Sequence, residues 1–250
     1  MDDTALLRRR LAELAERAYN SGIYTYSGFL SLAEQDVLQQ CRRQLTPCGI
    51  SLFGGADGCE RLMLRCGSEE LCGYSEPYPI ACLEVVLPQK SDIRLGHRDY
   101  LGALLALGLE REQLGDIIVL ERGAVLFCRE AMADFITREL TSVGRANVSC
   151  RLCAAPPPEA VRQTERIRVN VSQARLDAVI AHLYHLSRGD AAELLAARKV
   201  FVDGLQVEDG ARRLKEGELV SLRGLGRFIY RGEVGESRKG RLLVEVEKYV

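Results

Sequence analysis

The chain has 250 residues, a net charge of −1 and 47% hydrophobic residues, which is enough for one large domain or two to three small ones. Every apolar run is shorter than the roughly 18 residues of a membrane helix, and the N-terminus has the pattern of a charged amphipathic helix instead of a signal peptide. Nine cysteines without a secretory signal indicate reduced thiols in the cytoplasm, and the near-zero charge excludes a generally polycationic chain.

Residues 1–75 have the pattern of a small α/β domain. The hydrophobic periodicity predicts two helices and a hairpin: residues 4–19, 31–43, Ile50–Phe53 and Arg61–Cys66. The Gly-rich turn at residues 54–58 lacks the Gly-Lys-Ser/Thr ending of a phosphate loop, and it lies in a hairpin instead of before a helix. No phosphate loop is therefore expected here.

Residues 76–153 alternate between strand and helix periods. The pattern predicts six elements: Ile80–Leu87, Asp99–Leu109, Asp116–Glu121, Ala124–Arg129, Ala131–Leu140 and Ala146–Leu152. Their order, β-α-β-β-α-β, is that of the ferredoxin-like motif, which is frequent among RNA-recognition scaffolds and among many other proteins. The aromatic signature of the RNA-recognition motif is missing, so base stacking on this sheet is not expected.

A proline-rich segment follows. Residues 154–170 are expected to be a linker, because Pro156, Pro157 and Pro158 cannot sustain the interior of a helix or a sheet. The predicted fold class is α+β with three small domains: an N-terminal α/β domain, a ferredoxin-like middle domain and a C-terminal domain over residues 171–250.

Two short amphipathic helices open the C-terminal domain. The core face of the first is formed by Leu176, Val179, Ile180 and Leu183. The second begins at Ser187, and Ser187 and Asp190 have the spacing of a capping box. A helix that continued to Lys199 would place Arg188 and Lys199 on one face, about three turns apart.

A tight hairpin follows the helices. Val200–Val202 and Leu205–Val207 have strand character, and Asp203-Gly204 between them is typical of a type I′ turn. A further strand is expected at Leu219–Arg223. The chain then ends in an extra β-hairpin, Arg227–Val234 and Arg241–Val246, around a basic tip at residues 237–240.

These motifs, in this order, resemble the S4 RNA-binding domain. The matching strings are Arg175-Leu176-Asp177, Leu186-Ser187-Arg188, Val200-Phe201-Val202-Asp203-Gly204, Glu216-Gly217-Glu218, Arg223-Gly224 and Gly226-Arg227-Phe228. The family usually has Gly where this chain has Lys199, and Asn where it has Asp203.

The resemblance implies that basic side chains of this region bind RNA. Arginine suits the role because its planar guanidinium can hold a phosphate through two hydrogen bonds and can stack on bases. Arg188 is the strongest single candidate, since it lies at a helix N-terminus that also favours phosphate. For any one of these arginines, an ordinary solvated charge is an equally good interpretation. The expected RNA-binding residues are Arg175, Ser187, Arg188, Arg198, Lys199, Arg212, Arg213, Lys215, Arg223 and Arg227.

His97-Arg98-Asp99 invites comparison with the kinase catalytic loop, but that loop needs Asn where this chain has Leu104. The longer string His97–Gly102, with Leu107–Arg111 and Gly115–Ile117, resembles instead a hallmark of the YlmH family of bacterial S4-domain proteins. The resemblance covers essentially the whole chain and is weakest before residue 50. It implies rRNA and tRNA on the large ribosomal subunit as targets, and a role in the rescue or quality control of stalled translation.

Two functional hypotheses remain. The favoured one is a non-catalytic protein that recognises structured RNA by its backbone and shape. The alternative is an RNA-modifying or processing enzyme to which the S4 domain delivers substrate, with His97, Arg98 and Asp99 as candidate residues. In the binding hypothesis these three residues form a second RNA contact or fix the start of a helix.

Cys150 and Cys153 form a single CxxC pair. A zinc site needs four ligands, and Cys66 with Cys72 has the wrong spacing to supply the other two. A redox role for the pair stays open, although cysteines on the core face of a strand are commoner. The sequence therefore predicts neither a metal nor a cofactor.

Overall fold

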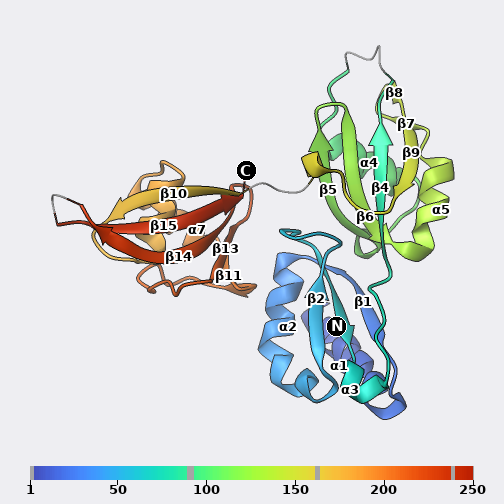
Figure 1. Ribbon diagram of the computed structural model, residues 1–250, viewed down its shortest axis with the longest axis horizontal. Coiled ribbons are helices and arrows are strands. Elements are labelled where there is room, and N and C mark those ends of the chain that lie inside the picture. The colour runs from blue at the N-terminus through green and yellow to red at the C-terminus, as the bar shows by residue number, and fades with distance from the viewer. Residues whose placement is uncertain (1–2, 89–92, 161–163, 238–239, 250) are drawn as a thin grey trace. The chain divides into compact units, whose positions relative to one another are not determined.

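The computed structural model describes residues 3–88, 93–160, 164–237 and 240–249 (Figure 1). The chain divides into two compact units, Met1–Val161 and Arg162–Val250, which we call the N-terminal and C-terminal units. Each unit has its own sheets and its own hydrophobic core. Within the described ranges, no helix is both long enough and apolar enough to span a membrane.

The first part of the N-terminal unit is a three-stranded antiparallel sheet in the order β1-β3-β2, with two long helices. Its elements are α1 (Asp3–Ser21), β1 (Thr25–Leu30), α2 (Leu32–Leu45), β2 (Ile50–Phe53), β3 (Leu62–Cys66) and α3 (Glu69–Cys72). Both helices and the hairpin match the prediction. Strand β1 has no counterpart in it, because Ser27 and Gly28 interrupt the apolar pattern and pairing with β3 fixes the strand instead.

The second part of this unit is a four-stranded sheet in the order β5-β6-β4-β9, in which all neighbours are antiparallel. The elements are β4 (Ile80–Val86), α4 (His97–Ala106), β5 (Leu114–Leu120), β6 (Gly123–Arg129), α5 (Glu130–Glu139) and β9 (Ser149–Cys153). The strand predicted at Ala146–Leu152 is divided. Its first residues form β8 (Ala146–Asn147), which pairs with the preceding strand β7 (Ser142–Val143) across a turn at Gly144.

The two faces of this sheet are covered by different parts of the chain. Helices α4 and α5 pack on one face through Leu104 and Ile136. On the other face, Phe127 packs in one cluster with Phe29 and Met63 of the first part. A Cβ at Gly55 would lie 2.3 Å from the Phe127 ring, so the Gly-rich turn allows the backbone to pack closely against this ring. Because of this shared core, the boundary expected near residue 75 does not separate two compact units.

The C-terminal unit is a six-stranded sheet in the order β10-β15-β14-β13-β11-β12, with two helices packed on one face. Its elements are β10 (Thr164–Val171), α6 (Leu176–Leu183), α7 (Arg188–Ala196), β11 (Val200–Val202), β12 (Leu205–Gln206), β13 (Leu219–Leu222), β14 (Gly226–Glu236) and β15 (Leu242–Tyr249). Strands β14 and β15 form the expected C-terminal hairpin. Residues 238 and 239, at the basic tip of this hairpin, lie outside the described part of the chain.

The linker expected at residues 154–170 is shorter in the structure. Strand β10 occupies most of its second half and pairs with β15 from Thr164↔Tyr249 to Val171↔Leu242. Ile167, Val169 and Val171 alternate toward the core of the C-terminal unit, a period-two pattern that the adjacent prolines obscured.

Both helices of the C-terminal unit end in Schellman motifs without glycine. After α7, Arg198 (φ 57°) donates its amide to Leu195 O at 3.0 Å, and Lys199 donates to Leu194 O at 3.0 Å. The position that favours Gly is therefore Arg198, not Lys199. Because α7 ends at Ala196, Lys199 does not continue a helical face with Arg188.

Candidate nucleic-acid interface

The start of α6 is fastened to the loop that carries the arginine pair Arg212 and Arg213. The amide of Leu176 donates to Arg212 O at 2.9 Å, and Arg175 forms an isolated β-bridge with Arg213. Arg175 therefore lies beside Arg212 and Arg213 at one end of the helix, although it is distant from them in the sequence.

Two of these three arginines are paired with carboxylates of their own unit. Arg175 makes two hydrogen bonds to Asp177, at 3.1 and 2.6 Å. Arg212 contacts Glu218 at 2.6 Å, and Glu218 is 8% exposed. Such bidentate and partly buried pairs hold the loop in place, so most of this charge is compensated within the fold. Arg213 is exposed.

Ser187 and Asp190 form the predicted capping box at the start of α7. The Ser187 hydroxyl accepts from the Asp190 amide at 3.1 Å, and the Asp190 carboxylate accepts from the Ser187 amide at 3.0 Å. Hydrogen bonds from the Ser187 side chain and backbone lower the pKa of Asp190 below its usual 3.8. Ser187 is thus engaged in the cap, and it presents Arg188, exposed at the first helical position.

A second group of cations gathers where α7 meets β11. Arg198 pairs with Glu208 at 3.0 Å, and both side chains are more than half exposed. The amide of Arg223 donates to Lys199 O at 2.9 Å, which places these two basic residues on adjoining backbones. The Arg223 guanidinium lies 5.6 Å from the centroid of the Phe201 ring.

Arg227 departs from the prediction. It lies on β14, where Phe228 and Tyr230 point to the helix-covered face, so Arg227 points to the opposite face. Its side chain is 4% exposed, donates to Ser221 Oγ at 3.2 Å and stacks 5.8 Å from the Tyr249 ring. These contacts make Arg227 a structural residue, because a buried guanidinium cannot reach a phosphate.

The ten residues expected to bind RNA fall into two groups: those whose side chains already interact within the protein, and those whose side chains are free to contact a ligand. Five are exposed and, within the described residues, their side chains make no hydrogen bond or ion pair. We call these the free cations: Arg188, Lys199, Arg213, Lys215 and Arg223. The remaining five cap a helix, pair with carboxylates or are buried.

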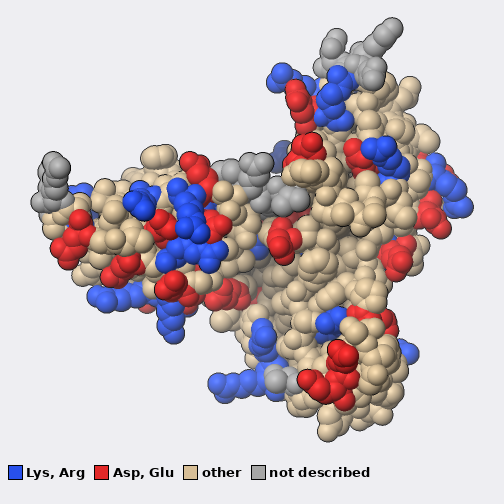
Figure 2. Space-filling view, viewed as in Figure 1, with Lys and Arg blue, Asp and Glu red and all other residues tan. Residues whose placement is uncertain are grey.

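Basic residues on the other face of this sheet were not predicted as site residues. Arg166 and Arg168 of β10 pair with Glu245 at 3.6 and 3.3 Å, and Arg231 pairs with Glu247 at 2.6 Å. Figure 2 shows basic and acidic side chains intermixed over β10, β14 and β15. On this face the arginines are therefore paired with carboxylates, in contrast to the free cations.

Helix α4, which packs on the four-stranded sheet of the N-terminal unit, begins with His97, Arg98 and Asp99. The Asp99 carboxylate accepts from the Gly96 amide at 2.7 Å, which fixes the helix start. The helix-start interpretation of Asp99 is thus confirmed. His97 and Arg98 are exposed on the first turn.

Cys150 and Cys153 lie on opposite faces of the sheet that contains β9. Cys150 packs on the α4–α5 side, whereas Cys153 packs with the cluster around Phe127. Burial raises the pKa of the Cys150 thiol to about 11. Two thiols on opposite faces cannot hold one metal ion together, and the described residues contain no group of three His, Cys, Asp or Glu suited to a metal.

Two family models match this chain. The model described as "Putative RNA-binding domain in YlmH" matches residues 74–155, and the S4 domain model matches residues 174–220. Four of the five free cations lie within the S4 match. The chain therefore carries two domains of RNA-binding families.

Two similar proteins extend the comparison. The chain is 30% identical over 221 residues to the "Ribosome-associated protein quality control protein P2" of Bacillus subtilis (strain 168), over 88% of this chain and 85% of that protein. A solved structure, "Cell division protein ylmH from Streptococcus pneumoniae", has a TM-score of 0.48 at 16% identity, over 64% of this chain and 96% of that chain. Because the Bacillus relative aligns with most of both sequences, and the middle segment matches the model named for YlmH, the chain belongs to the YlmH family.

Proposed function

We propose that this protein is a non-catalytic RNA-binding protein whose S4 domain docks on structured RNA through the free cations. The observation that carries the proposal is the unpaired state of these five side chains, in a unit whose other arginines are largely paired or buried. Unpaired guanidinium and ammonium groups can exchange their counterions for phosphates, which supplies most of the affinity for a nucleic-acid backbone. The capped and paired residues, Arg175, Ser187, Arg198 and Arg212, hold the free cations in place.

The proposed targets are the large ribosomal subunit and tRNA. The Bacillus relative is named as a ribosome-associated quality control protein, and this supports an equivalent role in quality control or rescue of stalled translation in the cytoplasm. A-form RNA hides its major groove from side chains, so a rigid cationic surface would recognise backbone and shape.

We further propose that the segment from β4 to β9 has a ferredoxin-like fold within the compact N-terminal unit. Its element order and its strand order β5-β6-β4-β9 support this assignment. His97 and Arg98 would then add a secondary RNA contact beside the helix start that Asp99 fixes.

Co-sedimentation tests the proposal directly. The wild type should pellet with the large ribosomal subunit from cell lysate, and Arg188→Ala with Arg213→Ala should remain in the supernatant. Mass analysis of the bound RNA should show neither a cleaved nor a modified product. Equal pelleting of the wild type and the double variant would contradict the S4 contact, and a new RNA product would support the enzyme alternative.

A further inference from the structure

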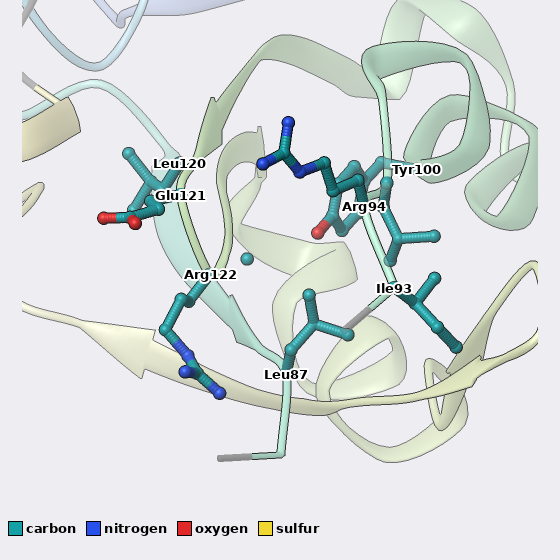
Figure 3. A pocket seen from close by; sticks show the side chains of 9 residues that line it. Leu87, Ile93, Arg94, Tyr100, Leu120, Glu121 and Arg122 are labelled. Atoms are coloured by element: carbon teal, nitrogen blue, oxygen red, sulfur yellow. The ribbon is translucent and has the colours of Figure 1, made fainter. Parts of the chain in front are cut away.

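A pocket of about 630 Å³ opens at one end of the four-stranded sheet of the N-terminal unit (Figure 3). Its walls come from Leu87, which directly follows β4, from the β5–β6 turn at Leu120–Gly123, and from the segment Ile93–Leu95 that leads into α4. Strands β4 and β5 run parallel, since both are antiparallel to β6, so their carboxyl ends and the start of α4 meet here.

Tyr100 contributes an unsatisfied hydroxyl to this pocket. The residue is 1% exposed, and its oxygen has no hydrogen-bond partner among the residues that the structure describes. Burial and the neighbouring Asp99 carboxylate raise the pKa of this phenol, so it remains a proton donor at neutral pH. A buried hydroxyl without a partner is unfavourable, and a bound acceptor would remove that penalty.

The remaining lining combines apolar walls with cations. Leu87, Ile93 and Leu120 are apolar, and Arg122 is anchored by a hydrogen bond to Pro88 O at 2.9 Å. Arg94 is exposed, and its side chain pairs with no other residue in the described ranges. Figure 3 shows the Tyr100 hydroxyl and the Arg94 guanidinium directed into the pocket, while the Glu121 carboxylate points away from its centre.

The sheet itself offers no alternative platform for a base. Its helix-free face is buried by the first part of the N-terminal unit, and Phe127 on that face is only 1% exposed. The helix-free face is therefore closed to a ligand, whereas the pocket at one edge of the sheet provides apolar walls, a hydrogen-bond donor and a cation.

We propose that this pocket binds one unstacked nucleotide, with its base between the apolar walls and an acceptor of the base edge on the Tyr100 hydroxyl. Arg94 would hold the phosphate. Apolar or aromatic contact with the faces of an unstacked base, together with hydrogen bonds to its edge, is the usual way in which proteins read single-stranded RNA. The same chemistry would accept a nucleotide within an RNA chain or a free mononucleotide. The site is separate from the S4 surface and does not depend on it.

Two variants test the pocket in the full-length protein. Tyr100→Phe removes only the unsatisfied hydroxyl, so the thermal unfolding midpoint should stay the same or rise. Two probes measure binding: calorimetry with the four nucleoside monophosphates, and anisotropy with labelled ten-nucleotide single-stranded RNA. Tyr100→Phe should weaken the binding of these probes about threefold to tenfold. Arg94→Ala should weaken the binding of the same probes about tenfold. Arg138→Ala, an exposed arginine on α5, is the matched control and should bind like the wild type.

The two probes separate the sources of the nucleotide. Monophosphate binding that both variants reduce identifies a free-nucleotide site, whereas loss confined to the RNA probe identifies an RNA residue. Equal binding of both probes by the wild type, Tyr100→Phe and Arg94→Ala would overturn the pocket proposal. That result would leave the S4 proposal intact, because co-sedimentation is tested through Arg188 and Arg213.

Discussion

The carboxylate of Asp116 on β5 accepts the backbone amide of Arg61 at 2.9 Å and that of the adjacent Glu60 at 2.7 Å. The Arg61 side chain, 8% exposed, donates in return to Leu114 O at 2.9 Å and to Phe29 O at 2.7 Å. These bonds join the three-stranded and four-stranded sheets through buried polar groups. They explain why residues 1–161 form one compact unit although the sequence predicts two domains there.

Asp116→Ala should destabilise the N-terminal unit by about 3 kcal/mol, because it leaves two buried amides without their charged acceptor. Denaturant unfolding followed by circular dichroism measures the loss. Asp134→Ala, which removes an exposed carboxylate from α5, is the control and should change stability by less than about 0.5 kcal/mol. Equal stability of the two variants would show that the Asp116 contacts do not join the sheets.

Arg198→Gly should stabilise the C-terminal unit by about 1 kcal/mol, since glycine adopts the positive φ at the end of α7 without strain. The lost ion pair to Glu208 is exposed and contributes little. Arg198→Ala loses the same pair but keeps a Cβ, so it should give no gain. Thermal unfolding of the three proteins distinguishes backbone strain from charge, and a gain shared by both variants would refute the strain argument.

Ser187→Ala should destabilise the same unit by about 1 kcal/mol at neutral pH through loss of the α7 cap. The cap lowers the pKa of Asp190, so its contribution is complete above the usual value of 3.8 and is lost as the pH falls through the lowered value. The stability difference between the wild type and Ser187→Ala should therefore narrow below about pH 4. Urea titrations across pH 2.5–7 measure it, and a difference that stays constant over this range would argue against the capping box.

Cys150 should react slowly with iodoacetamide in the native protein, because its thiol has a pKa of about 11 and forms little thiolate at neutral pH. Mild oxidation should yield no Cys150–Cys153 disulfide, since the two side chains lie on opposite faces of β9. Peptide mass spectrometry after alkylation measures both properties. A disulfide formed in the native state would contradict this placement.

Local signals in the sequence were sufficient for several parts of the structure. The capping box at Ser187 and the type I′ turn at Asp203-Gly204 were predicted correctly, because both depend on residue types at short fixed spacing. Strand β10 was missed, because its partner β15 lies more than seventy residues away in the sequence. The shared core around Phe127 was missed for the same reason.

The candidate site shows a similar limit. Sequence identified which residues are basic, but not which of them have a carboxylate partner. Arg212 and Arg213 are adjacent in sequence, yet Arg212 pairs with Glu218 and Arg213 is a free cation. The burial of Arg227 follows from its face of β14, which depends on sheet pairing that the local pattern does not reveal.

The central claim is that the free cations contact RNA phosphates. Binding to purified large ribosomal subunits across a salt series tests it with two matched pairs of substitutions. One pair is Arg188→Ala with Arg213→Ala, and the other is Arg166→Ala with Arg168→Ala, which removes paired arginines from the opposite face. The slope of log K against log salt should become shallower by about one for each lost phosphate contact in the first pair only. An unchanged slope for Arg188→Ala with Arg213→Ala, or an equal change in both pairs, would contradict the claim.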